Sequence, residues 1–295
     1  MVLPRLRLRR RLILPLAACV GCLSLGAPAA LAQAPAAAPT VYRFSPVNQW
    51  DIAKTAAYWN PIVQYVEGKS GIRLELKIGR TSADTTSYVL AREVEFVFSN
   101  HLFSPDRDAL GWKVFGRRNV PQIYGQIAVP ADSPIQKLEE LEGKTMVFAG
   151  PEAFIGYKVT YGQMLARGIN VKVEFGGNQN AAFAQMFSGR AQATGSNSML
   201  VEGYANRENR KFRVLWTSEG YHDLALMASS KVPDAHVRAV AKAFIEMHQD
   251  PAGREILRRA SEAVGLSEQP HFIASSDADY ASYRRFYQKA PPSLR

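Results

Sequence analysis

The fold class follows from residues 145–194, TMVFAGPEAFIGYKVTYGQMLARGINVKVEFGGNQNAAFAQMFSGRAQAT. Three short apolar runs within it have the length and composition of buried strands, and the two longer stretches between them have helical character. The strands are expected at Thr145–Phe148, Val171–Phe175 and Ala191–Thr194, and the helices at Ile155–Arg167 and Asn180–Phe187. Strands that alternate with helices at this spacing are typical of βαβ units, so we expect largely parallel sheets flanked by helices.

The same alternation extends in both directions from this stretch. Further strands are expected at Val41–Phe44, Ile72–Ile78, Glu95–Phe98, Ile123–Val129, Arg213–Thr217 and Leu224–Ala228. Further helices are expected at Ile52–Gly68, Thr85–Arg92, Ser133–Leu141, Met199–Asn206, Pro233–Gln249, Pro251–Ala263 and Asp277–Gln288. Pro61 must kink the first of these helices or restart it. A segment of about 260 residues is large for one doubly wound sheet and comfortable for two.

The N-terminus has the pattern of an export signal. Five arginines precede an apolar run, Leu12–Leu25, and Ala30-Leu31-Ala32 has the small residues of a cleavage site. We expect residues 1–32 to be a cleaved signal peptide and residues 33–40 to be a flexible linker. Leu16-Ala17-Ala18-Cys19 leaves lipid anchoring at Cys19 as the alternative. The expected location is the periplasm.

Charge and cysteine usage exclude several classes of protein. The chain carries a net charge of +10, and five of its positive charges lie in the leader, which leaves about +5 on the mature protein. That excess is too small to indicate a nucleic-acid partner. Both cysteines, Cys19 and Cys22, also lie in the leader. With cleavage after Ala32, the mature chain is therefore expected to have no disulfide and no cysteine ligand for a metal.

Several segments, in order, resemble the phosphate, phosphite and phosphonate periplasmic binding proteins of ABC importers. They are Phe44-Ser45-Pro46, Tyr58–Val66, Ser70-Gly71-Ile72, Glu95–Asn100, Ala131–Ile135, Gly143–Phe148, Gly177–Ala182 and Ser188–Ala193. The resemblance implies an α/β periplasmic-binding-protein fold of two lobes, each a mostly parallel sheet flanked by helices, joined by two hinge strands. It places lobe 1 at 41–127 and 226–295, lobe 2 at 128–225, and the crossings near Ile123–Val129 and Leu224–Ala228.

The chain departs from the family where the family holds its anion. A run of Ser and Thr is usual after the strand Thr145–Phe148, but this chain has Gly150-Pro151-Glu152-Ala153-Phe154. Gln179 stands where the family commonly has His, and Ser196-Asn197-Ser198 where it commonly has an acid. If Glu152 faces the cleft, it repels an oxyanion about 4 Å away by roughly 4 kcal/mol. A neutral or zwitterionic solute is therefore favoured over another oxyanion, and both over phosphonate.

Candidate ligand-binding residues come from two arguments. Ligands of open α/β sheets bind beyond the carboxyl ends of the strands. The resemblance places the family's anion loop at Glu152, Phe154 and Tyr157, and its return crossing beside Tyr221 and His222. The candidates are Ser45, Asn48, Trp50, Ser99, Asn100, His101, Glu152, Phe154, Tyr157, Gln179, Asn180, Ser196, Asn197, Tyr221 and His222. Gln49 lies in the same first loop. Helix capping and helix packing are the competing interpretations for most of them.

Glu219, Tyr221, His222 and Asp223 superficially resemble a metal site or an acid–base pair. His222 and Asp223 are adjacent in an extended segment, so their side chains point to opposite faces and do not converge on one ion. No metal, cofactor or catalytic residue is therefore expected.

The sequence thus predicts a solute-binding protein that closes two lobes over a small ligand without changing it. Its expected partner is an ABC permease or, alternatively, a sensor histidine kinase, and the protein is expected to be a monomer. An exported enzyme on the same scaffold is the remaining alternative, which needs a nucleophile and a base or a metal.

Overall fold

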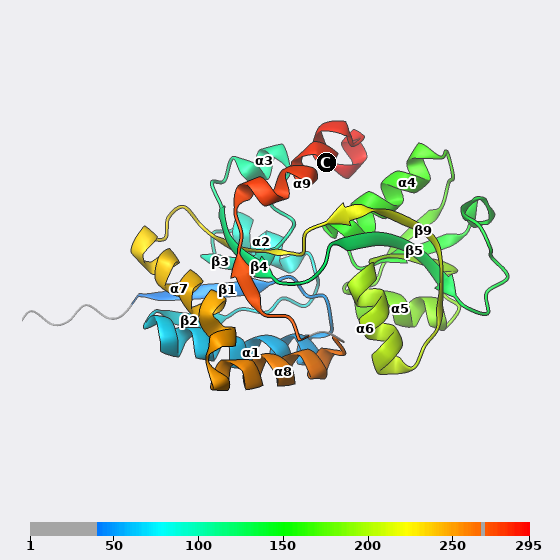
Figure 1. The fold of residues 1–295 in the computed structure, drawn as a ribbon. Coiled ribbons are helices and arrows are strands. Elements are labelled where there is room, and N and C mark those ends of the chain that lie inside the picture. Colours follow the sequence, from blue (N-terminus) through cyan, green and yellow to red (C-terminus); the bar gives the residue numbers. More distant parts are fainter. Residues whose placement is uncertain (1–39, 267–268) are drawn as a thin grey trace, which may run out of the picture. The chain divides into compact units, whose positions relative to one another are not determined.

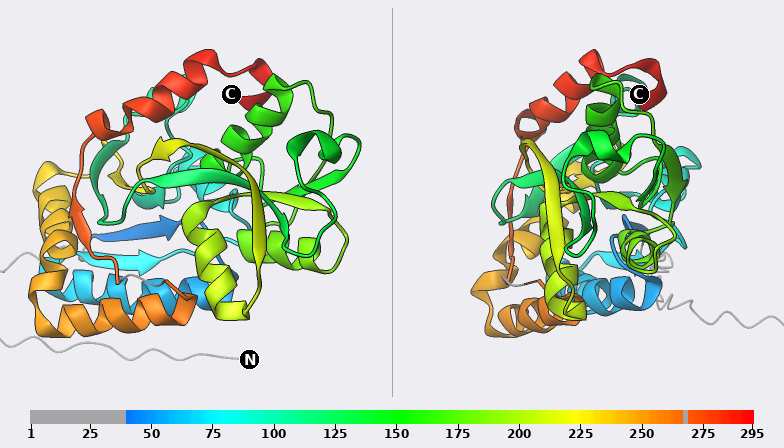
Figure 2. Two further views of the ribbon diagram at one scale, coloured as in Figure 1. Left: turned by 45° about the vertical axis from the view of Figure 1, so that its right-hand side comes forward. Right: turned by 90° about the vertical axis from the view of Figure 1, so that its right-hand side faces the viewer.

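The computed structural model of the chain describes residues 40–266 and 269–295. The expected signal peptide, residues 1–32, and residues 33–39 of the expected linker lie outside the described residues. Two sheets with helices against them make up the described part (Figures 1 and 2).

The first sheet has the strand order β11-β4-β10-β3-β1-β2. Its strands are β1 (Val41–Pro46), β2 (Arg73–Leu76), β3 (Phe96–Ser99), β4 (Lys113–Arg118), β10 (Ala225–Ala228) and β11 (Phe272–Ala274). β1 pairs in parallel with β2 and β3, whereas β10 runs antiparallel to both of its neighbours, β3 and β4. The carboxyl ends of β1, β2 and β3 therefore meet at one edge.

The second sheet has the order β7-β6-β8-β5-β9. Its strands are β5 (Ile123–Pro130), β6 (Thr145–Phe148), β7 (Lys172–Phe175), β8 (Ala193–Asn197) and β9 (Phe212–Tyr221). β6 pairs in parallel with β7 and β8, and β5 runs antiparallel to β8 and β9. β5 and β9 lie side by side (Figure 1).

Helices pack against both sheets. They are α1 (Ile52–Ser70), α2 (Asp84–Leu90), α3 (Pro105–Asp108), α4 (Thr160–Ala166), α5 (Gln179–Phe187), α6 (Ser198–Glu208), α7 (Asp234–Glu246), α8 (Pro251–Val264) and α9 (Ala281–Lys289). Shorter turns are 3₁₀ at Leu138–Leu141, Met247–Gln249, Asp277–Tyr280 and Pro292–Leu294. α1 and α8 lie side by side under the first sheet (Figures 1 and 2).

Local sequence explains the limits of α1. The Asp51 side chain caps the helix by accepting a hydrogen bond from the Lys54 backbone N–H, and Gly71 ends it with φ 70°. One face carries buried side chains that include Trp59 and Val66. The helix continues through Pro61 from Ile52 to Ser70, so of the two expected alternatives, a kink or a restart, the restart does not occur.

The expected two-lobed α/β class is confirmed, with corrections in detail. Each sheet is mixed rather than simply parallel, because β5 and β10 follow the crossings between the sheets and run against their neighbours. β4 and β11 have no counterpart among the expected strands. The expected helix Ile155–Arg167 begins as a π-helix, Phe154–Val159, before α4.

The chain crosses between the sheets at residues 119–122, after β4, and returns at 222–224, before β10. All of β5 lies in the second sheet, so the first crossing precedes the expected segment Ile123–Val129. Below, "first half" means the described residues before β5 and after β9, and "second half" means β5 through β9.

The two halves share apolar cores. One core joins Phe183, Leu200 and Val201 of the second half to Trp50 and Trp59 of the first. Another joins Phe154 and Ile155 to residues around β3 and α9. The structure is therefore a closed arrangement, with the halves in contact.

Candidate functional site

A small cavity of about 40 Å³ lies where the two halves face each other. The first half lines it with Val47, Asn48, Gln49, Ser82, Asn100, His101 and Leu224, and the second with Ala149, Ala153, Phe154, Ile155, Gly156, Gln179, Asn197 and Leu200. At about 10–15 Å³ per water, it has room for roughly three water molecules. A ligand held there contacts both halves at once.

The first-half wall is built from loops at strand ends. Asn48 and Gln49 follow β1, Ser82 lies beyond β2, and His101 follows β3. The loop after β2 is held firmly, because Asp84 accepts hydrogen bonds from the backbone N–H groups of Arg80 and Thr81. This arrangement follows the rule that open α/β sheets present their ligand loops at the carboxyl ends of the strands.

The second-half wall is built from the beginnings of three helices. Phe154, Ile155 and Gly156 open the π-helix that continues into α4, Gln179 is the first residue of α5, and Asn197 is the N-cap of α6. The first N–H groups of a helix have no partner within it. The π-helix also lies close to β8, because a Cβ at Gly195 would lie 2.4 Å from the Gly156 carbonyl oxygen.

The amide side chains of the wall are fixed by bonds to the protein. The Asn48 Nδ2 group donates to the carbonyl of Gly79. The Gln49 Oε1 atom accepts from Arg118 Nη2 at 3.2 Å, and Asn197 Oδ1 accepts from the Leu200 backbone N–H at 2.8 Å. Each of these amides therefore has one end committed to the protein.

Two buried polar atoms of the wall have no hydrogen-bond partner among the described residues. They are Asn48 Oδ1 and Ser82 Oγ. Ser82 lies against the second half, where its backbone N–H donates to the Gly177 carbonyl at 2.7 Å. A Cβ at Gly150 would lie 2.6 Å from Ser82 Oγ, so any side chain there would displace the Ser82 hydroxyl.

His101 is a neutral group in this wall. Burial lowers its pKa from 6.5 to about 3, despite the opposing charge of Glu152. Its Nδ1 atom lies 3.0 Å from Thr86 Oγ1, and its backbone N–H donates to Ser99 Oγ. The ring therefore brings a dipole to the cavity and no charge.

An ion pair joins the halves beside the cavity, and we call it the flanking pair. Arg107 of α3 donates two hydrogen bonds to Glu152, one of them 2.9 Å from Nη2 to Oε1, and a third to the His101 carbonyl. Both side chains are largely buried, with exposed fractions of 14% and 20%. Burial favours the neutral form of Glu152, but the hydrogen bond from Arg107 and the nearby charges lower its pKa overall.

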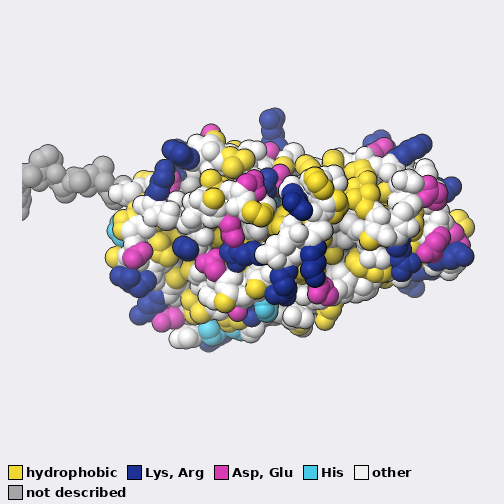
Figure 3. All heavy atoms as spheres, turned by 90° about the horizontal axis from the view of Figure 1, so that it is seen from above, with side chains coloured by type: hydrophobic (Ala, Val, Ile, Leu, Met, Phe, Trp, Pro, Cys, Tyr) yellow, Lys and Arg dark blue, Asp and Glu magenta, His cyan; other side chains and the backbone are white. Residues whose placement is uncertain are grey.

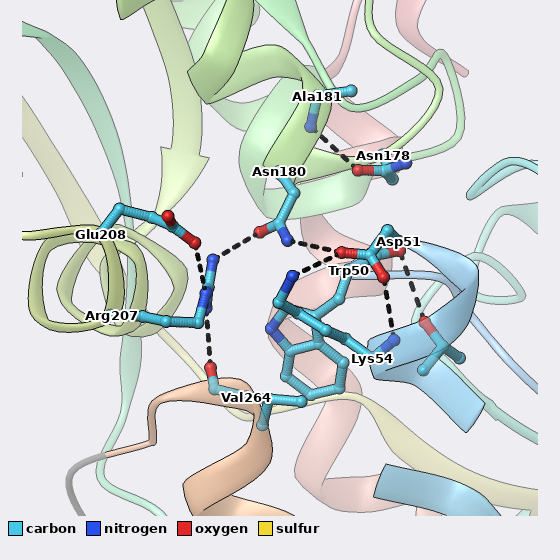
Figure 4. A network of polar contacts seen from close by, with 10 residues as sticks. Trp50, Asp51, Lys54, Asn178, Asn180, Ala181, Arg207, Glu208 and Val264 are labelled. Atoms are coloured by element: carbon cyan, nitrogen blue, oxygen red, sulfur yellow. Dashed lines mark hydrogen bonds and ion pairs between the residues drawn. The ribbon is translucent and has the colours of Figure 1, made fainter. Parts of the chain in front are cut away.

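A second polar bridge joins the halves through Asn180 (Figure 4). Asn180 Nδ2 donates to Asp51 Oδ2 at 3.3 Å, and Asn180 Oδ1 accepts from Arg207 Nη2 at 3.0 Å. Arg207 also donates to the Val264 carbonyl at 2.8 Å. This Asn180 bridge therefore ties α5 and α6 to the ends of α1 and α8.

A second ion pair lies where the chain crosses between the sheets, and we call it the crossing pair. Arg118 and Asp223 are fully buried, and Arg118 Nη2 donates to Asp223 Oδ1 at 3.0 Å. Arg118 also holds Gln49, as described above, and the Tyr280 hydroxyl donates to the Asp223 carbonyl at 2.7 Å. Asp223 is thus a structural partner of Arg118, whereas His222 is part-exposed.

Six of the residues proposed from the sequence line the cavity: Asn48, Asn100, His101, Phe154, Gln179 and Asn197. Contact with a ligand stays a prediction for them.

The structure places the other nine elsewhere, where packing or hydrogen bonding explains them. Ser45, Ser99 and Ser196 are buried with hydrogen bonds to neighbouring groups, and Trp50 packs on Tyr58. Glu152 and Asn180 join the halves, as described above. Tyr157 stacks on Tyr161, Tyr221 bonds to Glu219, and the His222 carbonyl accepts from Tyr283.

Two further polar residues of the cavity, Ser82 and Gln49, were not among the residues predicted from the sequence. The loop Gly79–Ser82 follows a recognised strand, so the strand-end rule contained the signal for Ser82. The apolar lining residues carry no sequence signal that separates them from ordinary core residues.

The described residues hold no group of three His, Cys, Asp or Glu side chains that would suit a metal ion.

Within residues 40–266 and 269–295, no helix has the length and hydropathy needed to cross a membrane. Positive and negative side chains are interspersed on the face that contains α9 and α4 (Figure 3), unlike the basic stripe of a nucleic-acid-binding surface.

Comparisons with known proteins agree with this architecture. The binding-protein component of an ABC phosphonate transporter from Pseudomonas aeruginosa has a TM-score of 0.72, with 14% identity over 85% of this chain and 87% of that one. PhnD1 from Prochlorococcus marinus, solved with methylphosphonate, has a TM-score of 0.73, with 13% identity over 85% and 98% of the two chains. A Xanthomonas citri protein solved with ATP has a TM-score of 0.64, with 15% identity over 84% and 96%. At these identities the structures establish the fold alone.

No curated protein sequence matches the chain. The sequence profile described as "ABC transporter, phosphonate, periplasmic substrate-binding protein" matches residues 44–280. Because that match spans most of the sequence, the chain belongs to this family and is a solute-binding protein of an ABC importer.

Proposed function

We propose that the cavity captures a compact oxyanion of about the size of phosphate or a small phosphonate. One observation carries this proposal: the beginnings of three helices of the second half line the same cavity. Free N–H groups and the positive end of the helix dipole make a helix N-terminus favourable for an anion. Three helix N-termini around one small cavity supply donors from several directions.

The charge of Glu152 does not repel this ligand, contrary to the expectation from the sequence. Glu152 does not line the cavity, and its carboxylate receives two hydrogen bonds from Arg107. A charge that is paired in this way has little net repulsion for a neighbouring anion. The preference for a neutral or zwitterionic solute loses its main support.

Among the described residues that line the cavity, none is Lys or Arg. The anion is therefore held by neutral donors, as His101 is neutral and the remaining polar side chains are amides or Ser82. Neutral donors that are fixed in advance bind an anion without the cost of burying an unpaired cation.

We further propose that the first half and the second half move apart about the two crossings to admit the solute. These halves correspond to the expected lobes 1 and 2, with the boundaries shifted to the crossings at residues 119–122 and 222–224. The flanking pair and the Asn180 bridge then break and re-form with each opening and closing, because each joins groups of opposite halves. Closure around a ligand is the usual hinge motion of periplasmic binding proteins.

The family is one of substrate-binding proteins, and we propose that the solute leaves chemically unchanged for an inner-membrane permease. Mass analysis of the bound compound before and after incubation tests this.

We also propose that the protein is a monomer released into the periplasm by cleavage after Ala32, with acylation at Cys19 as the alternative. Size-exclusion chromatography and the mass of the mature N-terminus test these points, and co-purification from membranes distinguishes a permease from a sensor kinase.

A thermal-shift screen tests the ligand class. Phosphate, phosphite, methylphosphonate, sulfate, zwitterionic amino acids and neutral sugars are compared at equal concentration. An oxyanion at a hundred times its dissociation constant should stabilise the protein by about 2.7 kcal/mol. Gln179→Ala should reduce that shift, whereas Gln136→Ala, at an exposed site of the same half, should preserve it. Stabilisation by zwitterions or sugars alone contradicts the proposal.

A further inference from the structure

The amides of the cavity present opposite ends to a solute. Arg118 occupies the oxygen of Gln49, and the Leu200 backbone N–H occupies the oxygen of Asn197. The N–H₂ ends of Gln49 and Asn197 are therefore the ends left for a ligand, and they are donors. Both suit an oxyanion.

Asn48 has the reverse arrangement. Its Nδ2 group donates to the Gly79 carbonyl, and its Oδ1 atom has no donor among the described residues. The residue is 1% exposed and lines the cavity. Asn48 therefore brings a buried acceptor with no partner to the wall, alongside the donor ends of Gln49 and Asn197. Gln179 shares this orientation, because its Nε2 group donates to Thr194 Oγ1 at 3.4 Å.

The Asn48 amide cannot turn over to become a donor. A flipped amide would place Oδ1 against the Gly79 carbonyl oxygen, where two acceptors repel each other. Gly79 cannot easily move away, because Asp84 accepts hydrogen bonds from both Arg80 and Thr81 in the same loop. The acceptor character of Asn48 is thus fixed by the loop after β2.

A buried acceptor without a donor is costly, and a solute that supplies the donor removes that cost. A fully ionised oxyanion has no hydrogen to give, and its oxygen would meet Oδ1 with repulsion. An oxyanion that keeps one O–H group can donate to Asn48 while its other oxygens accept from Gln49, Asn197 and the helix N-termini.

We propose that Asn48 is a specificity-determining residue that selects oxyanions carrying a hydrogen-bond donor over fully ionised oxyanions of the same size. The inference rests on the proposed function, because it concerns the same cavity. It narrows the ligand to hydrogen phosphate, a singly protonated phosphonate or an anion of equivalent chemistry.

Isothermal titration calorimetry of the purified protein with phosphate and sulfate tests this directly. The two tetrahedral anions are similar in size, but only phosphate keeps an O–H group at neutral pH. Phosphate should bind at least about fivefold more tightly, because an unsatisfied buried acceptor costs at least about 1 kcal/mol, which corresponds to that ratio of affinities. Methylphosphonate should bind more tightly below its second ionisation than above it, since only the singly protonated form has a donor.

Two variants assign the effect to a residue. Asn48→Leu removes the acceptor, so the ratio of phosphate to sulfate affinity should fall towards one. Gln49→Leu removes a donor, so both anions should bind more weakly while the ratio stays high. Thermal melts establish whether each variant is folded. If a variant does not fold, the ratio of phosphate to sulfate affinity of the wild-type protein still tests the inference.

The outcomes separate this inference from the proposed function. Equal binding of phosphate and sulfate by the wild-type protein overturns the selection but leaves oxyanion capture intact. If the ratio of phosphate to sulfate affinity stays high in Asn48→Leu, the role of Asn48 in the selection is overturned. No binding of any oxyanion overturns the proposed function and this inference with it.

Discussion

The crossing pair and the flanking pair place the same chemistry, arginine against a carboxylate, in two different regions. Arg118 and Asp223 have no exposed side-chain surface and lie where the chain passes between the sheets. Arg107 and Glu152 keep 14% and 20% of their side-chain surfaces exposed and belong to opposite halves. A fully buried pair cannot separate without leaving a buried charge that has neither a counter-ion nor water. A part-buried pair can be hydrated when it separates. The first pair is therefore suited to a permanent contact, and the second to a contact that forms on closure.

The largest expected effect comes from breaking the crossing pair. Asp223→Ala leaves Arg118 buried without its counter-ion, which should cost about 3–5 kcal/mol of unfolding free energy. Urea denaturation measures the loss. Asp108→Ala is the matched control, because it breaks the more exposed pair with Arg284 and should cost less than about 1 kcal/mol. Equal losses of unfolding free energy for the two variants would contradict the view that burial makes the crossing pair costlier to break than the exposed pair.

Protonation of His101 should give the next largest effect. Burial lowers the pKa of His101 from 6.5 to about 3, so the unfolded chain binds a proton that the folded chain does not. The unfolding free energy is therefore at its full value above pH 6.5 and falls as the pH falls towards 3. Urea titrations across this range measure the slope.

His101→Asn is the control for that slope, since it removes the titrating ring. Between these two pH values, the variant should take up about one proton fewer on unfolding than the wild-type protein does. An unchanged slope would assign the acid sensitivity to other groups, such as His222 and His271, whose pKa values burial also lowers.

Weakening the flanking pair should change ligand binding more than folding. Glu152→Gln keeps the shape of the side chain but removes its charge, so the closed arrangement loses stability relative to an open one. We expect solute affinity to fall about tenfold, mostly through faster dissociation, which stopped-flow measurements resolve. Glu139→Gln, in an exposed pair with Arg167 within the second half, should leave affinity unchanged.

Acid should reproduce the effect of Glu152→Gln. The pKa of Glu152 is lowered from 4.5 by its contacts with Arg107, so closure gains stability above pH 4.5 and loses it as the pH falls through the lowered pKa. Dissociation rates should rise in that range for the wild-type protein and much less for the variant. Parallel profiles would exclude Glu152 as the titrating group.

The smallest effect is expected at the Asn180 bridge. Asn180→Ala removes two neutral hydrogen-bonding ends that are partly exposed, at distances of 3.0 and 3.3 Å. Solute affinity should fall by about two- to fivefold, as one modest hydrogen bond is worth about 0.5–1 kcal/mol. If affinity falls more for Asn180→Ala than for Glu152→Gln, the Asn180 bridge contributes more to closure than the flanking pair, contrary to this prediction.

The sequence predicted most of the strands and helices, because their apolar runs are local. It missed β4 because the buried positions of that strand are Val114, Gly116 and Arg118, which show no apolar alternation. It missed β11 because three residues, Phe272–Ala274, are too few for a pattern. Asn48, Asn100 and His101 were found through the strand-end rule, which needs only the order of strands and loops. Phe154, Gln179 and Asn197 were found because they occupy ligand positions of the family that the sequence resembles.

The sequence by itself determined the order of elements, the two-lobed α/β class and the family, since these depend on patterns of neighbouring residues. Only the tertiary structure decided what the charged and amide groups do. Glu152 and Arg107 are 45 positions apart, and Asp223 and Arg118 are 105 apart. Electrostatic and hydrogen-bond partners are chosen by distance in space, so the free end of an amide such as Asn48 is known only when its partner, the Gly79 carbonyl, is in place.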